Sequence, residues 1–187
     1  MMTNETLSVI ASRRSHRAYQ RVQITPEQLD ALLTAAKESP SAMNRQPWHF
    51  TVVQNETLLN EINDAARQGV LARVQSQRSA RFEDEEFNVF YHAPTVVFLS
   101  ADPDNYWAKI DCGIAVENIA LAAESMGLGS VILGLPREAF LSSHGTRLRE
   151  MLGFPAGYDF VIAIAVGFAT DDKEPHPQME NRVTIIE

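Results

Sequence analysis

Apolar residues recur at helical spacing in several segments of the chain, and short runs of β-branched and aromatic residues lie between those segments. The clearest helix start is at Thr25, Pro26 and Gln28, which combine a capping threonine, a proline at the first helical position and a glutamine three residues after the cap. This helix must end by Ser39, because Pro40 disfavours helical geometry in the residue before it.

Further elements follow from the same patterns. Thr3 or Asn4 can cap a first short helix, Asn55 can cap another, and Gly127 stands where a left-handed residue would end a long helix over residues 106–126. A short helix is predicted over residues 146–152, and strands are predicted over residues 48–54, 95–100, 130–135 and 159–168. Two less regular parts remain: a charged helical excursion around residues 67–90, and a C-terminal arm over residues 169–187 with a short strand at residues 183–186.

Helices and strands interleave irregularly, which indicates a single domain of the α+β kind, an α/β sandwich with a sheet flanked by helices. The helix over residues 106–126 is apolar on every face, so other elements must surround it. A domain of 187 residues has difficulty enclosing such a helix alone. We therefore expect a homodimer.

The chain carries 16 Lys and Arg against 24 Asp and Glu, a net charge of −8, which disfavours nucleic acid and anionic membranes as partners. Within residues 1–21, however, there are four basic residues and a single acidic residue, Glu5. The basic residues are Arg13, Arg14, Arg17 and Arg21. That local excess of positive charge could bind a small anion. No apolar run approaches the roughly 20 residues of a membrane span, and the start of the chain has no targeting pattern, so we expect a cytoplasmic protein.

Several familiar sites can be excluded by inspection. Residues 127–132 begin like a dinucleotide-binding loop, but they follow a helix and have Ile132 where the third glycine should be. Residues 129–134 have phosphate-loop spacing, but Leu135 and Pro136 replace the required lysine and hydroxyl residue. The five histidines show no paired spacing for a metal, and no metal is expected.

Two other candidates have ordinary explanations. The single cysteine, Cys112, cannot form an internal disulfide, and it lies in an apolar helical stretch where a thiol behaves as a small hydrophobe. The charged residues of the tail, Asp171, Asp172, Glu174 and His176, are interpreted as a solvated cluster.

Residues 13–17 and 39–48 resemble the FMN-binding motifs of the nitroreductase family. The helix from Asp111 through Asn118 to residues 127–130 resembles that family's central helix, and Arg182 resembles its C-terminal arginine. The resemblance covers nearly the whole chain. It implies a central, mostly antiparallel sheet flanked by helices, an intertwined homodimer, tightly but non-covalently bound FMN, and NAD(P)H as a transient electron donor.

The resemblance also implies roles for individual residues. Arg13 and Arg182 would hold the FMN phosphate, Ser15 would bond phosphate or ribityl oxygens, Arg17 would face the pyrimidine edge, and Arg14 would add a further contact. Guanidinium groups suit these positions, because the phosphate is dianionic and the N1/O2 edge is anionic when the flavin is reduced.

Further contacts are implied by two other segments. The partner subunit would contribute Pro40, Ser41, Ala42 and Asn44, with Gln46 near the flavin pyrimidine, and backbone amides of Ile132, Leu133 and Gly134 would lie along the ring. Two departures from the family pattern stand out: Leu133 is apolar where relatives often have a polar residue, and Asn181 precedes Arg182 where relatives commonly have a basic residue or proline.

The implied reaction is a ping-pong transfer of hydride from NAD(P)H through flavin N5 to a nitroaromatic compound, a quinone or a similar small oxidant. The flavin carries this chemistry, so no dedicated catalytic side chain is expected. Two alternatives remain open. One is another flavin reaction on the same fold, such as dehalogenation, flavin fragmentation or azoline dehydrogenation, and the other is a non-enzymatic flavin-binding protein.

Overall fold

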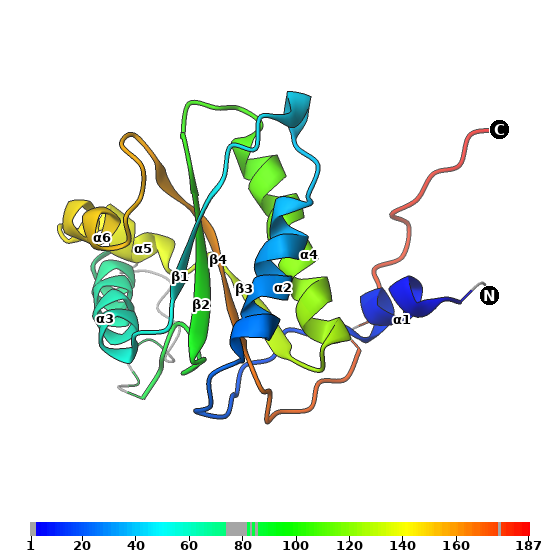
Figure 1. The fold of residues 1–187 in the computed structure, drawn as a ribbon, viewed down its shortest axis with the longest axis horizontal. Helices are drawn as coiled ribbons and strands as arrows, with labels where there is room; N and C mark the ends of the chain where they lie inside the picture. Colours follow the sequence, from blue (N-terminus) through cyan, green and yellow to red (C-terminus); the bar gives the residue numbers. More distant parts are fainter. Residues whose placement is uncertain (1–2, 74–81, 83, 85, 176) are drawn as a thin grey trace.

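The computed structural model describes residues 3–73, 82, 84, 86–175 and 177–187. Its centre is a sheet of four strands, all paired antiparallel in the spatial order β1-β2-β4-β3 (Figure 1). The strands are β1 (His49–Val53), β2 (Thr95–Ala101), β3 (Gly129–Leu133) and β4 (Asp159–Gly167). Among the described strands β3 pairs with β4 alone, so its other edge faces away from the rest of the sheet.

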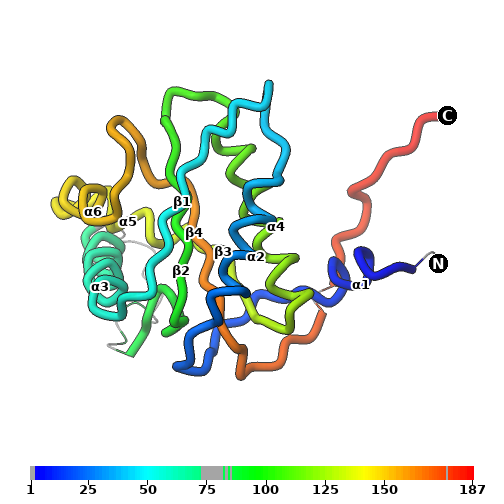
Figure 2. The backbone as a smooth tube through the Cα atoms, in the orientation of Figure 1, coloured from blue at the N-terminus to red at the C-terminus, as the bar shows by residue number. Residues whose placement is uncertain are grey.

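Helices cover both faces of this sheet. Helices α2 (Pro26–Lys37) and α4 (Ala108–Ser125) lie on one face, with α1 (Glu5–Ser12) beyond α4. Helices α3 (Glu56–Arg73), α5 (Arg137–Leu141) and α6 (Gly145–Met151) lie on the other face. The backbone tube shows the same three layers, with the C-terminal arm leaving the body on the side of α1 (Figure 2).

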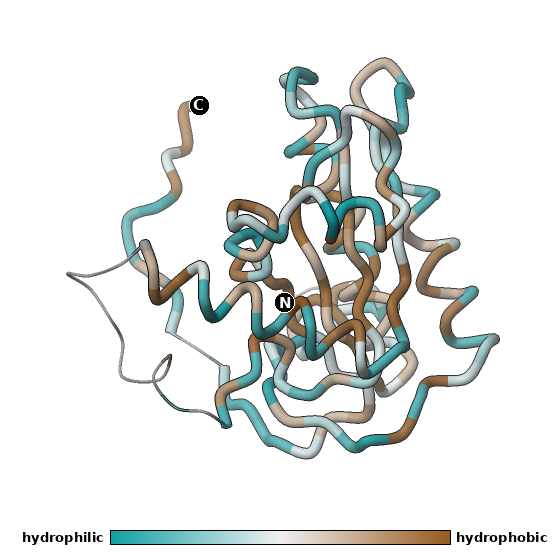
Figure 3. The backbone as a smooth tube through the Cα atoms, turned by 90° about the vertical axis from the view of Figure 1, so that its left-hand side faces the viewer, coloured by the Kyte–Doolittle hydropathy of each residue, from teal (hydrophilic) through white to brown (hydrophobic). Residues whose placement is uncertain are grey.

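Strand β2 separates two cores because its side chains alternate between the faces of the sheet. Val96 and Phe98 pack toward α3, α5 and α6, whereas Val97 and Leu99 pack toward α2 and α4. All residues of β2 are buried, which explains its run of apolar residues from Val96 to Leu99. Apolar stretches accordingly run along the strands at the centre of the molecule (Figure 3).

The capping predictions are confirmed. The Asn4 side chain accepts from the Leu7 N–H, which identifies the cap of α1. At Thr25 both bonds of the capping box form, at 3.2 Å and 2.9 Å. Asn55 caps α3, and Gly127 has a φ of +70° after α4.

Two expectations need correction or qualification, and one helix was not expected. The strand expected at residues 183–186 is wrong: these residues are extended and exposed, with no pairing partner in the described chain. Helix α5 was not predicted, because five residues are too few to show helical periodicity. The excursion expected around residues 67–90 begins as the last turns of α3 and ends in turns over residues 86–93. Residues 74–81, 83 and 85, which fall within it, lie outside the described residues.

Helix α4 is not fully surrounded within one chain. Ala115, Ile119 and Ala123 are buried, but Ile110 and Ile114 are 52% and 36% exposed. The expectation that something covers every face of this helix is therefore not met by the single chain. None of the described helices combines the length and apolar character needed to cross a bilayer.

Candidate functional site

The arginine-rich segment of residues 13–17 lies along the start of β3. Ser15 forms a parallel bridge with Ser130, and the His16 N–H donates to the Ser130 carbonyl at 2.9 Å. Gly129 permits this approach, because a Cβ at that position would lie 3.2 Å from the His16 Cβ, tighter than ordinary packing allows. Backbone contacts thus fix the segment to the outer edge of the sheet.

The first two guanidinium groups of the segment are partly held by the protein. Arg13 Nε lies 3.3 Å from a carboxylate oxygen of Glu117 on α4. Arg14 Nη1 donates to the carbonyls of Ala11 and Arg13 at 2.7 Å and 2.8 Å. Arg14 Nε is buried and has no hydrogen-bond partner among the described residues. A buried donor without a partner is unfavourable, so an anion at this point would be stabilised.

The third guanidinium, that of Arg17, is exposed. Its Nη1 donates to the Ser15 carbonyl at 3.2 Å, and its central carbon lies 5.8 Å from the centre of the Tyr91 ring. Contact between a guanidinium and an aromatic face is attractive and orients the cation. Arg17 therefore remains accessible to a ligand while its direction is restricted.

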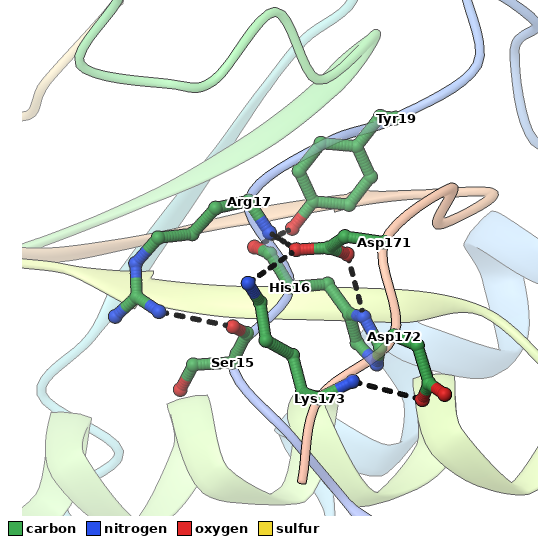
Figure 4. A network of polar contacts seen from close by, with 7 residues as sticks. All are labelled: Ser15, His16, Arg17, Tyr19, Asp171, Asp172 and Lys173. Carbon is green, nitrogen blue, oxygen red and sulfur yellow. Dashed lines mark hydrogen bonds and ion pairs between the residues drawn. The ribbon is translucent and has the colours of Figure 1, made fainter.

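Asp171, at the start of the C-terminal arm, clamps this segment (Figure 4). Its carboxylate accepts from His16 Nδ1 and the Arg17 N–H, both at 2.9 Å, and lies 3.1 Å from Lys173 Nζ. Burial alone would raise the pKa of Asp171, but the hydrogen bonds from Arg17, His16 and Lys173 and the charge of Lys173 hold that pKa below its ordinary value. The carboxylate is therefore ionised at neutral pH, and His16 Nδ1 must be the donor.

Tyr19 ties the arm to the segment a second time. It forms an antiparallel bridge with Ala169, and its hydroxyl donates to the His16 carbonyl at 2.8 Å. Burial, and next the charge of Asp171, raise the pKa of Tyr19 far above its ordinary value, so the phenol stays protonated as a donor. The arm and the arginine-rich segment thus form one rigid unit.

The expected backbone contacts of β3 lie on the same edge of the sheet. Beyond Ser130, no described residue pairs with this outer edge. The Ile132 side chain is 37% exposed, Leu133 is buried, and a Cβ added at Gly134 would meet no atom of the described residues within 4 Å. The structure therefore brings residues 132–134 and 13–17 to one edge of the sheet.

Residues 40–46, the second expected group, form a tight loop at the other end of the α2–α4 layer, near the start of α4. The Ala42 N–H donates to both carboxylate oxygens of the buried Asp111, at 3.2 Å and 3.3 Å. The Gln46 N–H donates to Ser41 Oγ at 2.9 Å. These bonds fix a loop whose outer residues, Pro40 among them, are exposed.

This loop is also strained. Met43, Asn44 and Gln46 have φ values of 54°, 52° and 45°, a region that costs non-glycine residues roughly 1 kcal/mol each. Gln46 Nε2 donates to Asn44 Oδ1 at 3.1 Å. The structure does not bring the loop to residues 13–17 of the same chain, so its role in a partner's site stays a prediction.

Arg182 lies on the exposed tail, away from the sheet. Its described contact is to Met179 Sδ at 3.7 Å, and no contact within the described chain joins it to Arg13. The expectation that these two arginines share a phosphate is therefore not met within one chain, and it stays a prediction.

The interpretation of the tail charges needs correction. Asp171 is not solvated, because its side chain is only 16% exposed and it clamps the arginine-rich segment. Asp172 and Glu174 are exposed as expected, and His176 lies outside the described residues. No group of potential metal ligands occurs in the described part of the chain. No pattern in the sequence indicates that Asp171 contacts this segment, because its partner His16 is 155 positions away.

Comparisons with known proteins agree with this geometry. A model of the nitroreductase family matches residues 10–168. A protein of Archaeoglobus fulgidus named putative NADH dehydrogenase/NAD(P)H nitroreductase is 36% identical, over 91% of this chain and 88% of its own length. The crystal structure of a nitroreductase with bound FMN from Desulfitobacterium hafniense superposes with a TM-score of 0.93 at 37% identity, covering 100% of both chains.

A more distant relative is the iodotyrosine deiodinase of Thermotoga neapolitana, 23% identical over 90% of each chain. The predicted fold, with its antiparallel sheet between helical layers, is confirmed by the structural match. The family match spans most of the chain and agrees with the arginine-rich segment, the edge strand and the central helix. The chain therefore belongs to the nitroreductase family.

Proposed function

We propose that this chain is an FMN-dependent oxidoreductase that takes electrons from NAD(P)H and passes them to a small organic oxidant such as a nitroaromatic compound or a quinone. The observation that carries the proposal is the placement of the arginine-rich segment, residues 13–17, along the outer edge of β3. The names of the Archaeoglobus fulgidus relative and of the FMN-bound Desulfitobacterium hafniense structure support it.

The residues at this edge fit FMN. Arg14 Nε is a buried donor without a described partner, and Arg13 is the preceding residue in the chain, so this part of the segment suits a phosphate. The open space at Gly134 and the unpaired outer edge of β3 suit a flat ring with hydrogen-bonding atoms along its rim. Arg17, exposed but restricted in direction, suits the more polar end of that ring.

When bound, FMN supplies the redox chemistry. The chain's part is to bind and orient. Arg17 holds a permanent positive charge where negative charge on a ligand would be stabilised. Asp171 restrains the His16 side chain and the Arg17 backbone. Backbone donors of residues 132–134 would help to orient a bound ring. We assign no catalytic side chain.

We also propose that two copies associate. Helix α1 has no buried residue, and its Leu7 and Ile10 are 43% and 50% exposed. Ile110 and Ile114 of α4, and Trp107 just before that helix, are exposed as well. A second copy would cover these apolar side chains and would bring its loop of residues 40–46 toward the site. Gel filtration with light scattering tests this, and a monomer at all concentrations would contradict it.

Titration of flavin-free protein with FMN tests the proposed site. Arg17→Ala should weaken FMN binding by about 1.5–3 kcal/mol, the range for hydrogen bonds to charged groups. Arg147→Ala is the matched control, because Arg147 is an exposed arginine of α6 that pairs with Glu61. Unchanged FMN affinity in Arg17→Ala would refute the assigned role.

The reaction class is tested by rapid mixing of FMN-loaded protein with NADH or NADPH. A reductase loses flavin absorbance on mixing. Retained absorbance would exclude a nicotinamide-driven reaction and would favour another flavin reaction. Dehalogenation of an iodotyrosine is then the first assay, given the deiodinase relative. Protein that binds flavin and shows no turnover in either assay would indicate a flavin-binding protein without enzymatic activity.

A further inference from the structure

A strained turn lies next to the arginine-rich segment. Tyr91 and His92 are consecutive, neither is glycine, and their φ values are +55° and +56°. Side chains larger than glycine seldom adopt this geometry, and two successive residues do so only where the surroundings hold them. Strain of this kind concentrates at ligand-binding sites, so the turn calls for a functional explanation.

Two buried asparagines hold the turn. Asn88 Oδ1 accepts from the N–H groups of Phe90 and His92 at 2.9 Å and 3.3 Å. Asn63 Oδ1, from α3, accepts from the Val89 N–H at 2.8 Å. Both asparagines are less than 10% exposed. The protein thus uses two buried carboxamides to keep one short turn in an unfavourable conformation.

The turn forms one wall of a pocket of about 370 Å³, which we call the Tyr91–His92 pocket. This volume lies within the range of about 300–1,000 Å³ for small-molecule sites. The lining includes three basic side chains, one acidic side chain and three aromatic rings: Arg17, Arg21, His92, Glu86, Tyr19, Tyr91 and Phe87. Basic groups therefore outnumber acidic ones here, although the whole chain carries a net charge of −8.

Two of the aromatic rings and one of the arginines contact one another. The Phe87 and Tyr91 rings meet edge to face, with centres 6.1 Å apart, and Arg17 lies over the Tyr91 ring. Arg21 and His92 line both this pocket and an adjoining cavity of about 160 Å³. Arg21 Nη1 is 3.6 Å from a Glu56 carboxylate oxygen, but both side chains are more than 70% exposed, so this pair is weak and leaves Arg21 able to bind an anion.

We propose that the Tyr91–His92 pocket binds a small aromatic carboxylate, with its ring against Tyr91 and Phe87 and its carboxylate toward Arg21 and His92. Arg17 belongs both to this pocket and to the proposed flavin-binding segment, so such a ligand would lie beside the flavin. The proposed binding of an aromatic carboxylate does not depend on the proposed oxidoreductase function, whereas the ligand's role as the electron-accepting substrate rests on that function.

Calorimetric titration of the FMN-loaded protein with benzoate and with benzamide tests the binding. The two probes share a ring and differ in charge, and benzoate should bind about tenfold more tightly. Arg21→Gln and His92→Asn should each weaken benzoate binding about threefold to fivefold, so the difference in affinity between benzoate and benzamide should become smaller. Asparagine tolerates left-handed geometry, so His92→Asn removes the imidazole and keeps the turn. Arg147 is remote from the pocket, so Arg147→Gln should leave the difference in affinity between benzoate and benzamide unchanged.

Equal affinity for the two probes, or benzoate binding that neither variant weakens, would overturn the proposal. Displacement of benzoate by FMN would also overturn it, since the pocket would then be part of the flavin site itself. If the protein fails to bind FMN, the proposed function fails, and the same titrations on flavin-free protein still decide the pocket. For the acceptor role, kcat/KM with NADH should be higher for 4-nitrobenzoate than for nitrobenzene; the reverse order would overturn that role.

Discussion

Replacing Asp171 with alanine removes the carboxylate that joins the C-terminal arm to the arginine-rich segment. The change leaves three donors without their acceptor: His16 Nδ1 and the Arg17 N–H, each at 2.9 Å, and Lys173 Nζ at 3.1 Å. Because the Asp171 side chain is only 16% exposed, water can replace these contacts only in part. Loosening of this segment should reach both the fold and the proposed FMN site.

The magnitude follows from the contacts. Hydrogen bonds to charged groups contribute about 1.5–3 kcal/mol each, and the contact with the more exposed Lys173 contributes less. Allowing for partial replacement by water, we expect Asp171→Ala to lower the free energy of unfolding by about 2–4 kcal/mol. For a chain of this length, that corresponds to a drop in Tm of about 4–16 °C.

Thermal unfolding followed by circular dichroism, at fixed protein concentration and with FMN removed, measures this effect. The matched control is Asp172→Ala, because the neighbouring carboxylate is exposed and accepts only from the Lys173 N–H within the described chain. The control should change Tm by no more than about 1–2 °C. Equal Tm values for Asp171→Ala and Asp172→Ala would refute the clamp.

Three further outcomes are expected. The pKa of Asp171 is lowered in the folded protein, so the stabilisation that its carboxylate provides is fully present above the unfolded pKa of about 3.9 and is lost as pH falls through the folded pKa. In unfolding scans across pH, the difference in stability between wild type and Asp171→Ala should therefore shrink below about pH 4. Gly129→Ala should lower stability by about 1–3 kcal/mol in urea unfolding, because the added Cβ would lie 2.5 Å from the Ala169 Cβ; an unchanged midpoint would contradict the close packing. Burial, and next the charge of Asp111, raise the pKa of Cys112 to about 12, so iodoacetamide should label this thiol only after unfolding, and rapid labelling of the native protein would contradict its buried position.

Elements whose determinants lie within a few residues could be predicted from the sequence. The capping box of Thr25 and Gln28 and the left-handed Gly127 act through neighbouring backbone groups, so the ends of α2 and α4 were correctly located. The strands were recognisable because β2 and β4 are apolar on both faces. The family resemblance also rested on local motifs, which is why it held.

The parts that could not be predicted depend on contacts between distant segments. Asp171 resembled any charged residue of a polar tail, and only the fold places it against His16. Likewise, no local pattern marks Tyr91 and His92 as left-handed: Asn88 bonds within the turn, but Asn63, which holds Val89, is 26 positions away on α3. The expected strand at residues 183–186 failed for the opposite reason: an apolar run favours a strand only where a partner edge is available.

A crystal structure of the FMN-saturated protein tests the central claim most directly. We predict flavin density against the outer edge of β3, with the phosphate near Arg13 and Arg14, the Arg17 guanidinium at hydrogen-bond distance from the ring, and residues 40–46 of a second copy closing the site. Density elsewhere on the chain, with the Arg17 guanidinium remote from the flavin, would contradict the account.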